Sequence, residues 1–252
     1  MKNQLSAILL GVALSAMSMG NTFAQQPNQV RINLLPLTTG TIAVEYERAF
    51  TQKLSAVGMV SYRPEGKLPF FSSWSSLIDE QETRDMLANS TQGAFSLAVE
   101  GRYYPGKKGV MRGFYLAPYL KHATYSAGVP LEVDFEPPAG VEPIDEVNLT
   151  GDFNTFSAGL GLGVQFSLGK NLSLDWKIIG PGYGSSKGSL IGKADRNLTP
   201  EEQAEIREEL DNLEDIPVLK IESKTVDAEG AEFKVKGPWA GIRTGLSIGY
   251  KF

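Results

Sequence analysis

A histidine and a serine in one stretch of the chain have the residue types of a hydrolytic site. His122 is the single histidine, and it precedes Ser126 by four residues. A histidine beside a hydroxyl group can remove its proton and make it a nucleophile. A lone histidine near the end of a strand is more often an ordinary polar residue. We therefore expect no enzyme, and a membrane-embedded lipid A or phospholipid hydrolase using His122 and Ser126 is the alternative.

Charged residues at alternating positions form a second candidate site. Five are basic and four are acidic, so their charges nearly cancel: Arg31, Arg102, Lys121, Lys177 and Arg243, with Glu45, Glu47, Glu100 and Asp175. Two carboxylates can act as general acid and base in hydrolysis, but buried opposite charges are usually structural ion pairs. What these residues can do depends on the elements that carry them.

Those elements are predicted to be β-strands, because apolar and polar residues alternate along eight segments. In the second of them, Ile42 and Val44 alternate with Ala43 and Glu45. The charged set lies opposite the apolar residues throughout, as do glycines 159, 161 and 163, which leave room for long side chains. The eight segments are 30–37, 41–50, 54–62, 95–104, 114–126, 153–167, 172–178 and 242–252.

The connections between these segments alternate in length. Residues 51–53, 105–112 and 169–171 are short turns, whereas 63–92, 127–151 and 183–237 are long loops. Short turns on one rim and long loops on the other are typical of outer-membrane β-barrels. Aromatic residues gather at both ends of the strands, as two interfacial girdles would; they are Phe50, Tyr103, Tyr104, Phe114, Phe166, Tyr250 and Phe252 at one end and Tyr62, Phe95, Tyr125, Phe153, Tyr183 and Trp239 at the other.

The sequence therefore predicts an all-β fold, an eight-stranded antiparallel transmembrane β-barrel with long extracellular loops. In each strand, every second residue belongs to one parity; the apolar parity faces lipid and the other parity faces inward. A soluble barrel also alternates, but it places its apolar face inward and its charges outward. In a barrel of eight strands the interior is just wide enough for its own side chains. We expect the charged set to pair there and to close the lumen, with a narrow solute channel as the alternative.

Composition and the first residues indicate export. The chain has 252 residues, no cysteine and a net charge of -5, so disulfides, thiol chemistry and a basic nucleic-acid-binding face are not expected. Residues 1–24, with Lys2, an apolar run and small residues before Ala24, read as a signal peptide cleaved after Ala24. Residues 25–252 would then form one barrel domain located in the bacterial outer membrane. We expect no cofactor and no metal site.

The C-terminal segment carries the most specific motif. It ends in Ser247-Ile248-Gly249-Tyr250-Lys251-Phe252, which resembles the signal by which the barrel assembly machinery recognises outer-membrane proteins. The segments 45–48, 100–105 and 113–119 also resemble a family of small bacterial outer-membrane barrels of unassigned function, similar in topology to the transmembrane domain of OmpA. This resemblance implies a fold and a location, and no activity.

The long loops hold the remaining features. Thr199-Pro200-Glu201-Glu202 is a capping box that predicts a helix over 200–212, and the segments 218–226 and 231–236 predict a hairpin. A short helix is expected across 77–87. The loop 127–151 is acidic, and it could bind divalent cations at the lipopolysaccharide surface. We expect a structural or surface-interaction role, with outer-membrane lipids, lipopolysaccharide and a possible protein partner as contacts.

Overall fold

The computed structural model describes residues 27–67, 69, 71, 75–132, 146–212 and 220–252. The predicted signal peptide and most of the acidic residues of the loop 127–151 lie outside these ranges. In the described part of the chain, no helix is long and apolar enough to cross a membrane.

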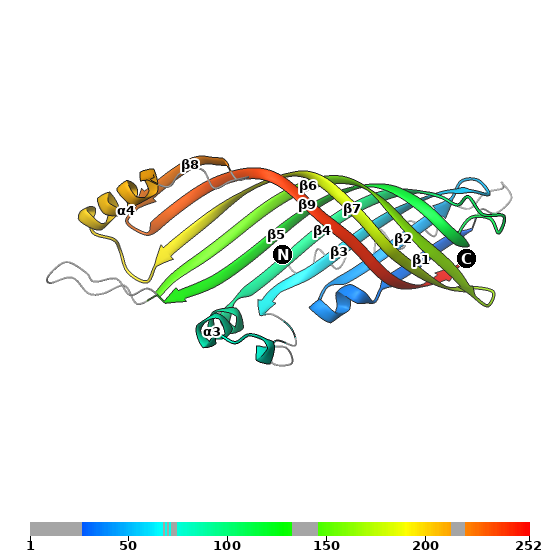
Figure 1. Ribbon diagram of the computed structural model, residues 1–252, viewed down its shortest axis with the longest axis horizontal. Coiled ribbons are helices and arrows are strands. Elements are labelled where there is room, and N and C mark those ends of the chain that lie inside the picture. Colours follow the sequence, from blue (N-terminus) through cyan, green and yellow to red (C-terminus); the bar gives the residue numbers. More distant parts are fainter. Residues whose placement is uncertain (1–26, 68, 70, 72–74, 133–145, 213–219) are drawn as a thin grey trace.

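Eight strands form a closed antiparallel barrel (Figure 1). Each strand pairs with the next, and the last pairs with the first, where Val30 lies opposite Tyr250. The strands are β1 (Asn28–Asn33), β2 (Ile42–Ala49), β3 (Leu54–Lys67), β4 (Thr91–Tyr103), β5 (Gly113–Glu132), β6 (Glu146–Leu168), β7 (Leu172–Ala194) and β9 (Gly230–Lys251). The predicted number of strands and their antiparallel order are confirmed.

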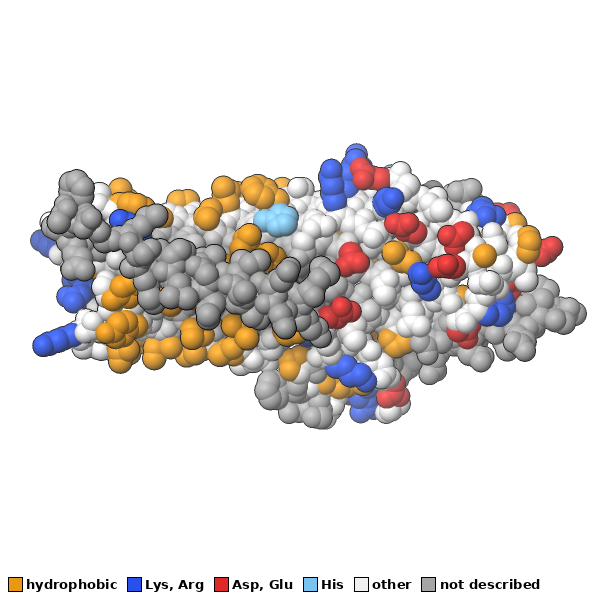
Figure 2. All heavy atoms as spheres, turned by 180° about the vertical axis from the view of Figure 1, so that it is seen from behind, with side chains coloured by type: hydrophobic (Ala, Val, Ile, Leu, Met, Phe, Trp, Pro, Cys, Tyr) orange, Lys and Arg blue, Asp and Glu red, His pale blue; other side chains and the backbone are white. Residues whose placement is uncertain are grey.

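The apolar side chains lie on the outside of the barrel. Phe114 is 64% exposed and Leu160 is 55% exposed, whereas Arg31 and Glu47 on the inward parity are almost completely buried. Figure 2 shows hydrophobic side chains covering one half of the molecule and charged side chains scattered over the other half. This distribution is the reverse of that in a soluble barrel.

Several strands are much longer than the alternating segments predicted, which corrects the three expected loops. Parts of 63–92, 127–151 and 183–237 belong to strands, and β6 and β7 each contain 23 residues. At about 3.3 Å per residue and a tilt of about 45°, 23 residues rise by roughly 54 Å, well beyond a hydrocarbon layer about 30 Å thick. Hydropathy does not alternate in the extra length, where Ser185, Ser186 and Lys187 of β7 are polar on both faces.

The first strand is shorter than predicted. The expected segment 30–37 leaves the sheet after Asn33 and forms the 3₁₀ helix η1 (Leu35–Thr39). Pro36 has no N–H group to donate to a sheet, and Asn33 Oδ1 accepts hydrogen bonds from the Leu35 and Leu246 N–H groups. Gly40 then ends the turn with φ 73°, a left-handed conformation that favours glycine.

The predicted helix and hairpin of the last loop are confirmed. Helix α4 spans Pro200–Asn212, and the capping box forms, because the Glu202 N–H donates to Thr199 Oγ1 and the Thr199 N–H donates to Glu202. Hydrogen bonds from Arg196 and from Thr199 lower the pKa of Glu202 to about 2. Strand β8 (Lys220–Asp227) pairs with β9 beyond the ring of eight strands.

Helix α4 packs on this hairpin, because Arg207 Nη2 donates to the Val226 carbonyl at 2.8 Å. The helix is thus part of the barrel's own extension. In the first long connection, η2 (Ser75–Leu77) and α3 (Gln81–Asn89) share the residues where one short helix was expected.

Candidate functional site in the barrel lumen

Two buried arginines form the centre of an ion-pair network in the lower lumen. Here "lower" means the end of the barrel with the short turns and the C-terminus, and "upper" means the end with helices α3 and α4 (Figure 1). Arg31 Nη2 lies 3.0 Å from Glu45 Oε2, and Arg31 also pairs with Glu47. Arg102 Nη2 lies 2.6 Å from Glu100 Oε1, and Arg102 also contacts Glu47 and Asp175. The two guanidinium groups thus share Glu47 and join strands β1, β2, β4 and β7 across the interior.

Lys177 and Arg243 extend the network toward the end of the barrel that carries the helices. Lys177 Nζ lies 3.1 Å from Glu100 Oε2, and Arg243 Nη2 lies 3.3 Å from the same oxygen. The network then holds four cations (Arg31, Arg102, Lys177 and Arg243) and four carboxylates (Glu45, Glu47, Glu100 and Asp175). Equal numbers allow each buried charge to be compensated, which offsets the desolvation cost of several kcal/mol per ion.

Neutral polar side chains satisfy the remaining oxygen atoms of the carboxylates. The Tyr115 hydroxyl donates to Asp175 Oδ1 at 2.8 Å, and Ser55 Oγ donates to Glu47 Oε1 at 2.5 Å. The Tyr104 hydroxyl lies within hydrogen-bond distance of Glu47 and Gln165. The prediction for Tyr104 was wrong: it is 0% exposed and lies in the lumen, not in an aromatic girdle.

Glycines of β6 make room for these tyrosines. A Cβ atom at Gly163 would overlap Tyr115, and one at Gly159 would overlap Tyr119. Space opposite the glycines was predicted, but aromatic rings occupy it rather than arginine or glutamate chains. The rings in turn support the cations: the Arg102 guanidinium lies 4.1 Å from the Tyr115 ring centroid, a favourable cation–π geometry.

Lys121 does not join the network, which corrects its predicted place there. No ion pair is formed by Lys121 in the described residues; its Nζ lies 3.2 Å from the Tyr125 hydroxyl. On β5 it lies two residues beyond Tyr119 and opposite Ala98 and Ser157, so no carboxylate faces it from the paired strands. The alternation of inward and outward residues therefore placed Lys121 in the lumen. It could not show how far along the barrel axis Lys121 lies.

Tyr125 and Trp239 also face the interior of the upper barrel. They share the inward parity of Lys121 and Arg243, and their rings stack with centroids 5.4 Å apart. Both were predicted to belong to the outer aromatic girdle, and that prediction is wrong. The inward parity of the two strands would have placed them correctly, but their position near the strand ends suggested an interfacial role.

The two residues of the hydrolase alternative are not brought together. His122 is exposed on the outer face of β5, between Leu97 of β4 and Phe156 of β6. Ser126 lies four residues farther along the same strand, about 13 Å away, beyond the reach of a direct hydrogen bond. Among the described residues, no group of histidine and acidic side chains could hold a metal ion.

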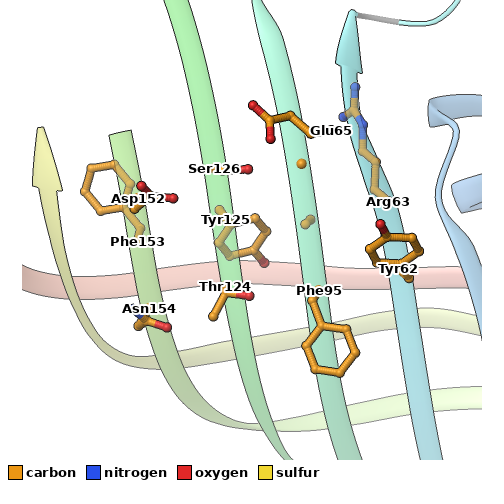
Figure 3. Close-up of a pocket in the computed structure, with 12 residues that line it drawn as sticks. Tyr62, Arg63, Glu65, Phe95, Thr124, Tyr125, Ser126, Asp152, Phe153 and Asn154 are labelled. Carbon is orange, nitrogen blue, oxygen red and sulfur yellow. The ribbon is translucent and has the colours of Figure 1, made fainter. Parts of the chain in front are cut away.

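A hollow of about 500 Å³ lies beside Ser126 at the β3–β6 wall (Figure 3). The labelled side chains include the carboxylates of Glu65 and Asp152 and the hydroxyl groups of Thr124 and Ser126. His122 does not line it. The hollow therefore brings carboxylates and hydroxyl groups together, with Asp152 opposite Ser126 in the sheet, and it places no histidine beside them.

The C-terminal motif forms the end of β9. Ser247 is buried on the lumen side, and Tyr250 and Phe252 are 54% and 45% exposed on the outside. Gly249 faces the lumen, where a Cβ atom would overlap Arg31. The Asn28 N–H donates to the Phe252 carbonyl at 3.0 Å and the Phe252 N–H donates back at 2.9 Å, so the last residue helps close the barrel.

Residues 8–204 match the family model described as "Protein of unknown function (DUF3575)". The chain also matches the crystal structure of a major outer membrane protein from Thermus thermophilus, with 14% sequence identity and a TM-score of 0.42. The match covers 91% of this chain and 100% of that chain. No curated protein is significantly similar in sequence.

Proposed function

The chain belongs to the DUF3575 family of proteins of unknown function, and we propose that it is a non-enzymatic outer-membrane β-barrel that presents a binding surface outside the cell. The observation that carries this proposal is the combination of an apolar outer belt with buried ion pairs in the lumen. The belt suits lipid, and ion pairs that fill the lumen would leave the extended end of the barrel as the place for interactions.

The outer belt supports a membrane position. Outward side chains such as Val99 and Leu160, 59% and 55% exposed, would be unfavourable in water over so large an area. A closed barrel satisfies every strand edge, which lipid requires. The short turns and the C-terminus lie at one end, which we assign to the periplasm. The long strands and both α-helices extend to the other end, which we assign to the outside.

The extended strands support a role in surface interaction. Strands β5, β6, β7 and β9 continue past the apolar belt as a rigid sheet, with α4 and β8 attached to it. Binding residues commonly accumulate on such extensions of a rigid scaffold. Lipopolysaccharide is the first candidate partner at this surface, and divalent cations or a second protein are further candidates.

The hydrolase alternative that uses His122 with Ser126 is not supported by their geometry. A hydrolase would need a base in contact with its nucleophile, whereas His122 and Ser126 are separated along one strand. A narrow channel is also disfavoured, because buried ion pairs occupy the lumen.

Single cysteines test the location and orientation, because the native chain contains none. A Glu229→Cys variant places a thiol in the β8–β9 turn, and a Lys108→Cys variant places one in the turn between β4 and β5; both positions are exposed. We expect a membrane-impermeant maleimide to label Glu229→Cys on intact cells and to leave Lys108→Cys unlabelled. After lysis, both variants should be labelled, which controls for thiol reactivity.

Labelling of Lys108→Cys but not Glu229→Cys on intact cells would reverse the proposed orientation. Failure of both variants to react before lysis, with recovery in a soluble periplasmic fraction, would contradict the membrane location.

A further inference from the structure

The upper lumen contains a second group of inward-facing residues that the ion-pair network does not use. Arg63, Ala94 and Tyr125 lie at one level across β3, β4 and β5. Lys121 and Trp239 lie at a second level. Lys121 pairs with Ser157 of β6, which pairs with Gly184 of β7, and Gly184 pairs with Trp239. We call the upper part of the lumen, into which the strand positions of Arg63, Lys121, Tyr125 and Trp239 face above Arg243, the vestibule.

The vestibule has an excess of positive charge. Below it, four cations and four carboxylates balance. Lys121 and Arg63 lie above this balanced set, and no described residue that faces the lumen above Glu100 is acidic. The nearby carboxylate of Glu65 belongs to the outer face, since its Cβ lies against the outward side of Gly93. The two cations therefore have no counter-charge among the described residues on the lumen side, although Glu65 and Asp152 line the hollow that Arg63 also lines.

Two guanidinium nitrogens here also lack hydrogen-bond acceptors. Arg63 Nη2 and Arg243 Nη1 are buried from solvent and have no partner, although Arg63 Nη1 donates to Gln92 at 2.9 Å. A buried donor without an acceptor is costly, and more so when it carries charge. Each arginine thus keeps one unused nitrogen, and guanidinium N–H groups bind the oxygens of a carboxylate or phosphate well. The unused donors thus match an oxyanion.

Aromatic rings and an unpaired strand edge also belong to the vestibule. The stacked pair of Tyr125 and Trp239 offers apolar ring surface beside Lys121, whose Nζ lies 5.8 Å from the Tyr125 centroid. Strand β9 pairs with β1 up to Ser247 and with β8 up to Lys236. Between these two positions, no other strand in the described part of the chain pairs with that edge of β9.

We propose that the vestibule binds a small organic anion, through its carboxylate or phosphate group, between Arg63, Lys121 and Arg243, with the Tyr125–Trp239 pair against its carbon skeleton. The proposal depends on the geometry of the upper lumen and is independent of the membrane location.

The test uses Trp239 as the reporter. The chain has three tryptophans, so replacing Trp74 and Trp176 with phenylalanine leaves one signal at the vestibule. The purified full-length barrel in detergent is titrated with pyrophosphate and, separately, with citrate, and sodium chloride at matched ionic strength is the reference. We expect a saturable change in fluorescence with at least one probe and none with chloride.

Variants identify the groups responsible. Lys121→Gln and Arg63→Gln should each weaken binding by about tenfold, the value of one charged hydrogen bond. Lys121→Arg should retain most of the affinity. Lys187→Gln, an exposed and outward-facing control on β7, should bind as the parent does. Retained heat-modifiability in gels shows that each variant is folded.

Absence of a saturable signal in the folded parent would overturn the proposal, as would equal weakening by Lys187→Gln. If Lys121→Gln does not fold, the comparison of Arg63→Gln with Lys187→Gln decides the result. A preference for pyrophosphate over citrate would identify phosphate as the group bound, and the reverse preference would identify carboxylate.

Discussion

An Arg102→Met variant is expected to lose about 3 to 5 kcal/mol of unfolding free energy, because removing one partner from a buried ion pair leaves an uncompensated charge. Arg102 is fully buried and contacts Glu47, Glu100 and Asp175. Methionine preserves most of its volume but leaves four carboxylates facing three cations. Unfolding in urea, followed by the change in gel mobility of the heat-modifiable barrel, measures the loss.

A matched control and a second-site variant make this result specific. Lys193→Met removes an exposed pair with Glu229, and its cost should be small because solvent screens both charges. Adding Asp175→Asn to Arg102→Met removes the surplus negative charge, so the double variant should be more stable than Arg102→Met alone. A loss for Arg102→Met no greater than that of the control would show that the network does not hold the barrel together.

Replacing Tyr250 and Phe252 together with serine is expected to reduce the barrel to a small fraction of its normal amount in the outer membrane. Both rings are exposed at the end of β9, where they suit recognition by the assembly machinery rather than internal packing. Quantitative blotting of the outer-membrane fraction, in a strain lacking periplasmic proteases, measures the effect.

The control for this variant is Phe50→Ser with Phe114→Ser. These two rings are 59% and 64% exposed and lie at the same end of the barrel, but outside the C-terminal motif. They should leave assembly largely intact. Equal losses for both pairs would assign the effect to the general burial of aromatic rings in the membrane interface. Normal accumulation of the Tyr250 and Phe252 variant would contradict the signal assignment.

The membrane-facing half of the barrel could be predicted from the sequence because lipid demands apolar residues on one parity. Val44, Leu97 and Leu160 meet that demand, and the inward parity follows from it. Beyond the belt, the side chains of β7 are polar on both faces near Ser185 and Lys187, so hydrophobic and polar residues do not alternate there. The sequence therefore could not indicate how far the strands continue.

The candidate site could be predicted only as a set of inward charges. Parity placed Arg31, Glu47 and Arg102 in the lumen, but pairing depends on the relative heights of strands, which alternation does not give. Lys121 illustrates this, since it shares the parity of the network and lies above it. Tyr104 and Tyr125 were ambiguous for another reason: an aromatic ring near a strand end suits the interface and the lumen equally well.

Buried charges that close the lumen of a membrane-spanning barrel should prevent ion flow through it. Planar-bilayer conductance of the purified, heat-modifiable protein tests this closure. The structure predicts insertion without discrete conductance steps, because paired arginines and carboxylates lie buried in the lumen. Reproducible, stepwise conductance by the unmodified protein would contradict the claim and assign the molecule to the channels.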